Sequence, residues 1–258
     1  MSGCGDYDEH VEFRIAEEGL AMRLHQRLLG LSIALAFGAG SAGVLASTGT
    51  VTQLSGTLSV KKADGSVRIL SQKSQIESGD TINTERESFA QIKFSDGAQL
   101  TLKPNTAVKI ESFKYSEEKP QEDSFLYSLV KGGLRAVTGV VGKRSKDKYQ
   151  LGTATATIGI RGTTLSADDC LSSRSGDCSR LDAAVYVGVS DGEIVVRNGQ
   201  GELGLAAGQF GLISPNQRPL FLSTDPGLQF TPPATFIQSV VAGSLVNSGK
   251  SLECVVTR

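Results

Sequence analysis

The stretch "FAQIKFSDGAQLTL", residues 89–102, decides the fold class of this chain. Before Asp96-Gly97 apolar residues alternate with polar ones, and the alternation resumes after this dipeptide. Such alternation places the apolar side chains on one face of a β-strand. Asp-Gly between two alternating runs predicts a hairpin with a type I′ turn, which needs positive φ at both central residues. The stretch therefore predicts two antiparallel strands with one buried face and one wet face.

Short alternating strands and glycine-containing turns recur over most of the chain. Helical periodicity is nearly absent from residues 48 to 214. The segments that begin at Gly56 and Gly192 are faintly similar, which leaves open a repeat of stacked β-arches. The sequence predicts an all-β domain of short antiparallel strands and β-arches, in the form of a β-roll, a short solenoid-like stack or a sandwich. The turn signal is repeated at Asp64-Gly65, Asp191-Gly192 and Asn198-Gly199.

A second stretch, "ATIGIRGTTLSADDC" at residues 156–170, contains an arginine and a glycine inside an alternating run. A strand from Ala154 to Arg161 would turn its alanines and isoleucines to one face. With strict alternation, Leu165 would then lie on the opposite face, together with Arg161. A bulge at Gly162 adds one residue and returns Leu165 to the apolar face, and glycine takes the positive φ that a bulge can require.

Arg161, Gly162 and Thr163 are therefore interpreted as a mainly structural corner of the sheet. The planar guanidinium of Arg161 can hold backbone carbonyls or a carboxylate where the strand ladder is broken. The alternative is a binding site, in which the arginine clamps a ligand carboxylate or phosphate. We predict no catalytic residue, no metal site and no cofactor.

The N-terminal part of the chain has the pattern of an export signal. Arg23 and Arg27 precede an apolar run, and small residues lead up to Ala46. This predicts a secretory signal peptide over 22–46, with 1–21 either untranslated or a short cytoplasmic tail. The apolar run is shorter than the ~20 residues of a membrane span, although an uncleaved anchor or a buried helix is the alternative. We expect a periplasmic or secreted protein without a membrane span in its mature chain.

Residue usage excludes several classes of function. No histidine follows His25 and the chain has no tryptophan, so Ser-His-Asp and Cys-His catalysis and histidine zinc sites are excluded after that point. Asp168 and Asp169 would point to opposite faces of a strand, which suits a carboxylate pair poorly. Without residues 1–46 the chain is only slightly basic, and this gives no attraction to nucleic acid.

The cysteines predict a covalent link in an oxidising compartment. Cys170 and Cys178 enclose a short loop, and a disulfide is the simplest interpretation. A metal site with oxygen ligands from Asp168, Asp169 and Asp177 is the weaker alternative, because no calcium-loop spacing is present. Cys254 is left over near the C-terminus and could link two chains or bind a partner's thiol. Most prolines lie in residues 214–258, which are expected to form an extended strap and tail.

Five segments between Thr50 and Ile213 carry a family resemblance. They are "LSQKSQIESGDTINTERESFAQIKFSDGAQLTLKPNTAVKI", "LVKGGLRAVTG", "TATATIGIRGTTLSA", "DGEIVV" and "LAAGQFGLI". In the correct order, they resemble the motifs of FecR-type domains, and the resemblance implies an all-β periplasmic or secreted domain over residues 50–213. Founding members relay an outer-membrane transport signal to a sigma factor, but too few residues precede the apolar run here for their sigma-binding region. That role is therefore not expected.

These features together predict a non-enzymatic, exported protein of the bacterial cell envelope. We expect it to act as a protein-interaction or regulatory and sensing module, with an envelope protein as partner and no nucleic acid. The alternative is a module that binds peptidoglycan or another carbohydrate. Sugar platforms use exposed aromatic side chains, and this chain has five tyrosines and no tryptophan.

Overall fold

The computed structural model describes residues 48–145, 147–172, 176–227, 230, 232–234 and 236. Contacts divide the chain into two compact units, Met1–Leu45 and Ala46–Arg258, and every described residue lies in the second unit. The predicted segments 1–21 and 22–46, and Cys254, lie outside the described residues. In the part of the chain that is described, no helix has the length and apolar character needed to cross a membrane.

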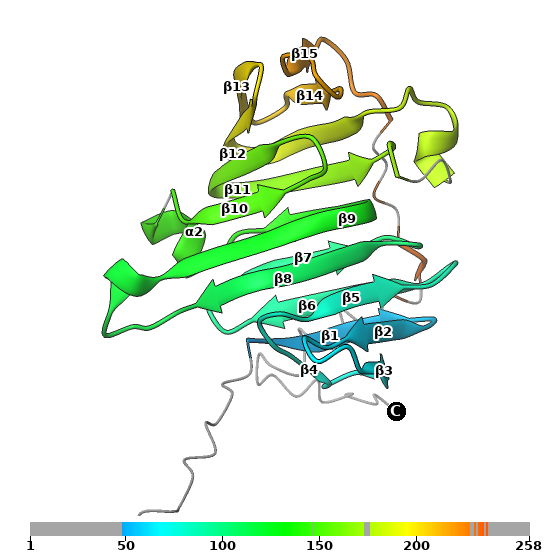
Figure 1. Ribbon diagram of the computed structural model, residues 1–258, viewed down its shortest axis with the longest axis vertical. Coiled ribbons are helices and arrows are strands. Elements are labelled where there is room, and N and C mark those ends of the chain that lie inside the picture. The colour runs from blue at the N-terminus through cyan, green and yellow to red at the C-terminus, as the bar shows by residue number, and fades with distance from the viewer. Residues whose placement is uncertain are drawn as a thin grey trace, which may run out of the picture. The chain divides into compact units, whose positions relative to one another are not determined.

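Most of the described structure is β-strand, and the strands belong to one 15-stranded sheet (Figure 1). The short helices α2 (Val140–Arg144), η1 (Pro120–Glu122) and η2 (Gly176–Ser179) lie between strands. The strands are β1 (Gly49–Ser55), β2 (Leu58–Lys61), β3 (Val67–Leu70), β4 (Gln75–Ile76), β5 (Thr81–Thr84), β6 (Phe89–Phe94), β7 (Gln99–Leu102), β8 (Ala107–Lys114), β9 (Ser124–Val137), β10 (Tyr149–Gly152), β11 (Thr157–Asp169), β12 (Val185–Asn198), β13 (Gly201–Ala206), β14 (Phe210–Ile213) and β15 (Leu220–Leu222).

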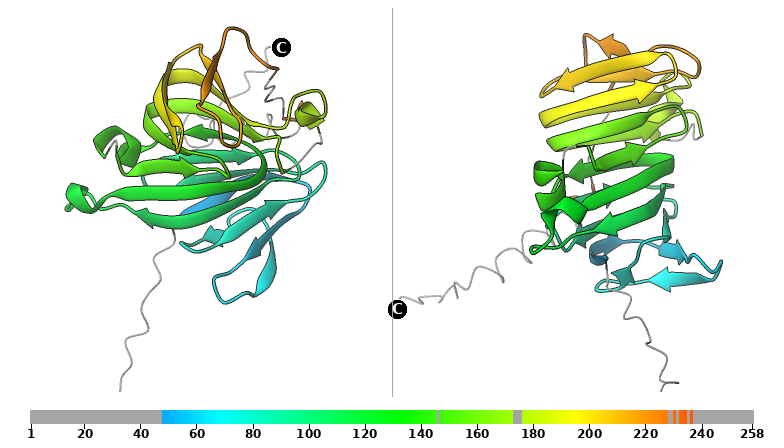
Figure 2. Two further views of the ribbon diagram at one scale, coloured as in Figure 1. Left: turned by 45° about the horizontal axis from the view of Figure 1, so that its top comes forward. Right: turned by 60° about the vertical axis from the view of Figure 1, so that its left-hand side comes forward.

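Three long strands show that this sheet is folded over into two layers. The first half of β9 pairs with β8 and β10, whereas its second half pairs with β7 and β11. β11 and β12 divide in the same way. The first layer runs β3-β2-β5-β8-β9-β10-β11-β12-β13, and the second runs β4-β1-β6-β7-β9-β11-β12-β14-β15. The predicted all-β fold is confirmed, and it is an open sheet stacked from β3 and β4 up to β13–β15 (Figures 1 and 2).

A glycine with positive φ marks the point where each long strand changes layer. These are Gly132 in β9 (φ 81°), Gly162 in β11 (φ 61°) and Gly192 in β12 (φ 79°). Residues with side chains rarely adopt such φ values, so glycine is suited to these bends. The predicted turn at Asp191-Gly192 is wrong, because the dipeptide lies inside one continuous strand. It bends this strand from one layer into the other and does not reverse the chain.

The other layer changes are made by arches, short segments that join a strand of one layer to a strand of the other. The arches β1–β2, β5–β6 and β7–β8 have positive φ at Gly56, Glu87 and Asn105. Strand register places these arches and Gly132 along one side of the second layer, which we call the arch edge. Gly162 and Gly192 lie along the opposite side, which we call the corner edge.

The predicted hairpin around Asp96-Gly97 is confirmed, but its turn is not of type I′. β6 pairs antiparallel with β7, and the Phe94 N–H donates to the Ala98 carbonyl. Of the two turn residues only Gly97 has positive φ, because the loop has three residues and needs a left-handed conformation at its last position alone. The Asp96 carboxylate accepts the Ala98 N–H and so holds this turn.

The core lies between the layers and is continuous from β2 to β14. Along β6 and β7 the predicted apolar face is buried, and Ile92 and Leu100 have no exposed surface. Burying a side chain of this size contributes about 1.5–3 kcal/mol. An aromatic cluster packs between the ends of β6 and β8 and the starts of β9 and β10, with ring centroids 4.5–5.9 Å apart, and it contains Phe94, Phe113, Phe125, Tyr127 and Tyr149.

The proline-rich segment is not an extended strap alone. It includes β15, which pairs with β14 and so adds a last strand to the second layer. Further along, Phe236 is buried, and its ring centroid lies 6.1 Å from that of Phe89 at the start of β6. The strap therefore returns from β15 at one end of the layer to β6 near the other end.

Candidate functional site

The Arg161–Thr163 motif lies at the corner edge, where β11 changes layer. The β11–β12 register shifts between Arg161 and Thr164, and Gly162 lies within this shift. Ile160 before the shift and Leu165 after it both have no exposed surface. The predicted bulge is therefore present, and it keeps both halves of the strand facing the core. The strand itself begins at Thr157 and not at Ala154, because residues 153–156 form the turn between β10 and β11.

Thr163 holds this corner in place. Its side chain is buried, and its hydroxyl donates to the Glu193 carbonyl at 2.6 Å. Its N–H donates to the Thr138 hydroxyl at 2.8 Å, and its carbonyl accepts the Thr138 N–H at 3.0 Å. Thr163 thus connects the bend of β11 to β12 and to the end of β9. The role of Thr138 could not be recognised from the motif, because Thr138 lies 25 positions earlier in the chain.

Gly192 belongs to the same corner, although it was not assigned to the motif. An added Cβ there would overlap the Gly162 carbonyl oxygen and would lie 2.9 Å from the Thr163 Cα. The backbones of the two bends are therefore in direct contact, without side chains between them. At Gly162 itself there is more room, since the nearest atom to an added Cβ would be the Lys143 Cγ at 3.9 Å.

Arg161 lies on the outer surface of the first layer. Its Nη1 is 3.4 Å from the Glu193 Oε1, and the two residues are opposite each other in the β11–β12 register. The side chains of Arg161 and Glu193 are 36% and 55% exposed. Of the two kinds of partner expected for Arg161, backbone carbonyls or a carboxylate, the structure shows the carboxylate. Thr163 makes the bond to a backbone carbonyl, since it is the residue that points into the corner.

Charged side chains next to Arg161 form a row on the same surface. Arg197 donates from Nε to the Glu202 carboxylate at 2.8 Å. This hydrogen bond lowers the pKa of Glu202 below its ordinary value, and the charge of Arg161 adds a smaller effect. The row is solvent-exposed, so water and salt screen each pair and the pairs add little to the stability of the fold.

The predicted disulfide is present at the arch edge, at the other end of β11. Cys170 and Cys178 are bonded, with their Cα atoms 5.1 Å apart. Both are buried in a small second core with Ala184 and Tyr186. The disulfide therefore anchors the β11–β12 loop to the sheet. The sequence motif and the disulfide lie at opposite edges and do not form one site.

Asp168 and Asp169 are buried near this loop, and each has its own hydrogen-bond partners. The Lys103 ammonium donates to both Asp168 carboxylate oxygens, at 2.8 and 3.0 Å. The Asp169 Oδ1 accepts the N–H groups of Leu171 and Ser172. The Asp168–Lys103 pair lies directly over Gly133, where an added Cβ would overlap the Asp168 carboxylate. No group of three metal-ligating side chains occurs among the described residues.

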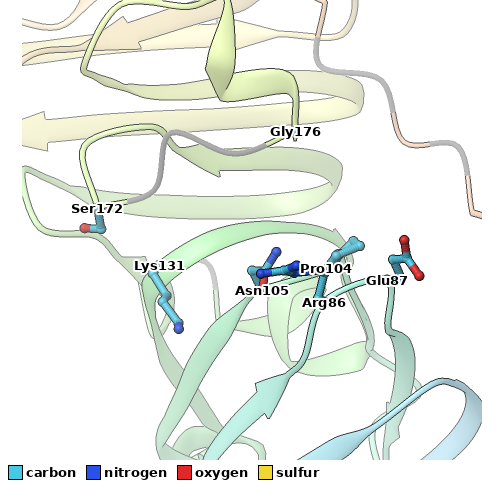
Figure 3. A pocket seen from close by; sticks show the side chains of 7 residues that line it. All are labelled: Arg86, Glu87, Pro104, Asn105, Lys131, Ser172 and Gly176. Atoms are coloured by element: carbon cyan, nitrogen blue, oxygen red, sulfur yellow. The ribbon is translucent and has the colours of Figure 1, made fainter.

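A surface hollow of about 600 Å³ lies along the arch edge, between two arches and the disulfide loop (Figure 3). It carries both charge signs. The cations come from Arg86 and Lys131 and the anion from Glu87, and all three side chains are exposed. It is lined by Arg86, Glu87, Pro104, Asn105, Lys131, Ser172 and Gly176.

Several titratable groups are buried near α2, namely Asp96, Tyr127 and Tyr149. Burial raises the pKa of Asp96 above its ordinary value, although the N–H groups of Ala98 and Val141 partly oppose this. Burial likewise raises the pKa of the Tyr127 and Tyr149 phenols, which therefore remain protonated at neutral pH. These groups belong to the core and are not open to a ligand.

Most of the exposed large apolar side chains among the described residues lie on strands at the ends of the layers. Val67 and Ile69 in β3 are 66% and 72% exposed, and Leu220 and Phe221 in β15 are 50% and 52% exposed, whereas Val130, which is 50% exposed, lies on the central strand β9. These end strands could not be recognised from the sequence, because an alternating pattern does not reveal which strand is last in a sheet. Exposed apolar side chains on a sheet edge are typical of surfaces that bind another chain.

The fold is that of a two-layered β protein with bent long strands and exposed end strands. Residues 80–195 match the family model of the FecR protein. The chain therefore contains a FecR domain, and the resemblance noted in its motifs is confirmed.

Comparisons with solved structures and curated proteins add only distant matches. Two crystal structures of a candidate anti-sigma factor from Parabacteroides distasonis are 15% identical, with a TM-score of 0.42. They cover 57% of this chain, which spans 60% of theirs. A cell surface anchoring domain is 27% identical over 24% of this chain and 83% of its own, with a TM-score of 0.24. No curated protein matches the sequence.

Proposed function

We propose that this chain is an exported, non-enzymatic module of the bacterial cell envelope, which regulates or senses by binding another protein. The observation that carries the proposal is a rigid FecR-type fold with a strand edge whose apolar side chains are exposed at Val67 and Ile69. Isolated exposed apolar residues are common, but two on one free edge strand favour contact with a partner.

Export is supported by the disulfide and by the signal-like pattern at 22–46. Disulfides persist in oxidising compartments such as the periplasm and are rare in the cytosol. Cys170 and Cys178 lie at bonding distance and are buried, so the link is part of the folded protein. A non-enzymatic role is supported by the acidic residues, since Asp168 and Asp169 already serve Lys103 and backbone N–H groups.

A carbohydrate-binding role has less support. Three of the five tyrosines are in the cores, with Tyr127, Tyr149 and Tyr186 at most 3% exposed. Sugar platforms need such rings at the surface. Among the described aromatic residues, Phe221 is exposed, but it lacks a polar group for orienting a sugar.

The test is photo-crosslinking in cells that export the full chain. A photoreactive residue is placed at Ile69, at Phe221 and, as a control, at Gln150 on the outer face of β10. We expect a discrete protein adduct from at least one edge position and none from Gln150. A glycan array probed with the same purified chain covers the alternative. Saturable glycan binding without any protein adduct would overturn the proposal.

A further inference from the structure

β3 is the last strand of the first layer. It pairs with β2 alone, from Leu58↔Leu70 to Lys61↔Val67. The hairpin turn fixes which backbone groups face β2, because the Lys62 N–H donates to the Ser66 carbonyl at 2.8 Å. In an antiparallel pair, hydrogen-bonded and non-hydrogen-bonded positions alternate. Since Lys62 and Ser66 are bonded, the next pair, Lys61 and Val67, is not.

The backbone groups of Val67 and Ile69 therefore point away from β2, toward the open side of the sheet. Within the described part of the chain, neither residue has a hydrogen-bond partner on that side. These two residues offer two N–H donors and two carbonyl acceptors, which is the pattern that a further antiparallel strand requires.

The side chains of β3 determine what such a strand should carry. Val67 and Ile69 project from the outer face and are mostly exposed. Arg68 projects from the opposite face and is also exposed, whereas Leu70 is buried and fixes the strand to the core. An added strand would therefore meet apolar groups on one face and a cation on the other.

The charge of Arg68 argues against a second copy of this chain. Suppose that β3 paired with β3 of a second copy and that Val67 and Ile69 both formed backbone hydrogen bonds with it. The two Arg68 residues would then lie directly opposite each other. Like charges at such positions are destabilising. The exposed cations of the β2–β3 hairpin are Lys61 and Arg68, Lys73 follows β3 in the chain and is also exposed, and Asp64 in the hairpin turn is an exposed anion. Charge complementarity thus favours an acidic partner.

We propose that β3 is a strand-addition site for an extended segment of a partner protein, in which apolar residues alternate with an acidic residue opposite Arg68. This inference rests on the proposed protein-binding function and names the place of contact. Edge strands of natural proteins are commonly protected by charge. Here Arg68 excludes self-pairing and selects the partner.

The test uses two capped peptides, Thr-Val-Glu-Val-Thr and Thr-Val-Lys-Val-Thr, titrated to millimolar concentration against the isotope-labelled full chain. We expect the glutamate peptide to shift the Val67 and Ile69 amide resonances in a saturable way and to slow their hydrogen exchange. It should bind at least fivefold more tightly than the lysine peptide. Arg68→Glu should reverse this preference. A contact that depended on shape alone would show no such reversal.

Ile69→Pro is the matched variant for the backbone contact. Proline is tolerated where an edge-strand N–H faces solvent, so the β2–β3 bonds and the melting temperature should be retained. Peptide binding should fall at least tenfold, whereas Phe221→Asp in β15 should leave it unchanged.

Shifts that map elsewhere, an unaffected Ile69→Pro variant, or no binding at millimolar peptide would overturn the inference. A chain that dimerises through β3 would overturn it as well. If the in-cell adduct forms at Phe221 and not at Ile69, protein binding stands and this docking site does not.

Discussion

The chain passes between the two layers at both the corner edge and the arch edge, but different contacts hold it at each edge. At the corner edge, backbone packs on backbone, with Gly192 against Gly162 and Thr163 bonding to its neighbours. At the arch edge, a buried ion pair between Lys103 and Asp168 lies over Gly133. The first arrangement depends on the missing side chains of Gly162 and Gly192 and on the hydroxyl of Thr163, whereas the second depends on a buried pair of opposite charges.

The difference shows that a prominent motif residue need not carry the stability of its region. Arg161 is the most conspicuous residue of its stretch, yet it lies on the surface at the corner edge. Asp168 was a weak candidate for a metal ligand or a catalytic carboxylate pair, yet it is buried and bonded to Lys103. Burial decides the energetic weight of a charge, because water screens an exposed pair and not a buried one.

The largest effect is expected from Gly192→Ala. The substitution combines strain at positive φ with overlap against the Gly162 backbone, and should destabilise the fold by ~3–4 kcal/mol. Gly162→Ala is the matched control, because it carries the strain without the overlap and should cost about 1–2 kcal/mol. Denaturant unfolding measures both. Equal losses would show that the two bends are not in contact.

The next largest effect is expected from Asp168→Ala, which should lower the free energy of unfolding by ~2–4 kcal/mol. The substitution leaves the buried Lys103 ammonium without this carboxylate. The double variant Asp168→Ala with Lys103→Met removes both charges and should recover part of the loss. Urea unfolding of the two single variants and the double variant gives the coupling free energy. A double variant as unstable as the sum of the singles would contradict the buried-pair interpretation.

Loss of the disulfide should be smaller still and confined to the arch edge. Replacing Cys170 and Cys178 by serine should cost ~2–3 kcal/mol, because the link closes a short loop. Amide hydrogen exchange should quicken around Tyr186, which packs with the disulfide, and remain unchanged at Thr163 on the opposite edge. Faster exchange at both edges would show that the two regions are not independent.

The smallest effect is expected from Arg161→Ala, at about 1 kcal/mol or less, because its pair with Glu193 is exposed. Thr163→Val is the informative comparison. It keeps the shape, removes the bond to the Glu193 carbonyl and should cost ~1–3 kcal/mol. Thermal melting ranks the two. If Arg161→Ala is the worse variant, the surface position of this arginine does not describe its role.

Local features of the fold could be predicted from the sequence, and relations between distant segments could not. Alternation gave the strands β6 and β7, and parity along residues 158–165 gave the Gly162 bulge, because both depend on neighbouring residues. Asp191-Gly192 was misinterpreted, since the same dipeptide supplies positive φ for a hairpin turn or for a bend between layers.

The candidate sites depended more on long-range packing. The disulfide could be predicted because its cysteines are close in the chain. The Lys103–Asp168 pair could not, since its residues are 65 positions apart. The open edge of β3 follows from its place at the end of a layer, and its four residues carry no signal of that place.

The contact of Phe236 with Phe89 has a mechanical consequence. A pulling force on the chain beyond Phe236 would first load this ring contact on β6, and β15 would be shielded. Once Phe236 detached, the tension would reach the three-residue β15, which pairs with β14. Tension applied beyond Phe236 would therefore meet the ring contact before it meets the sheet.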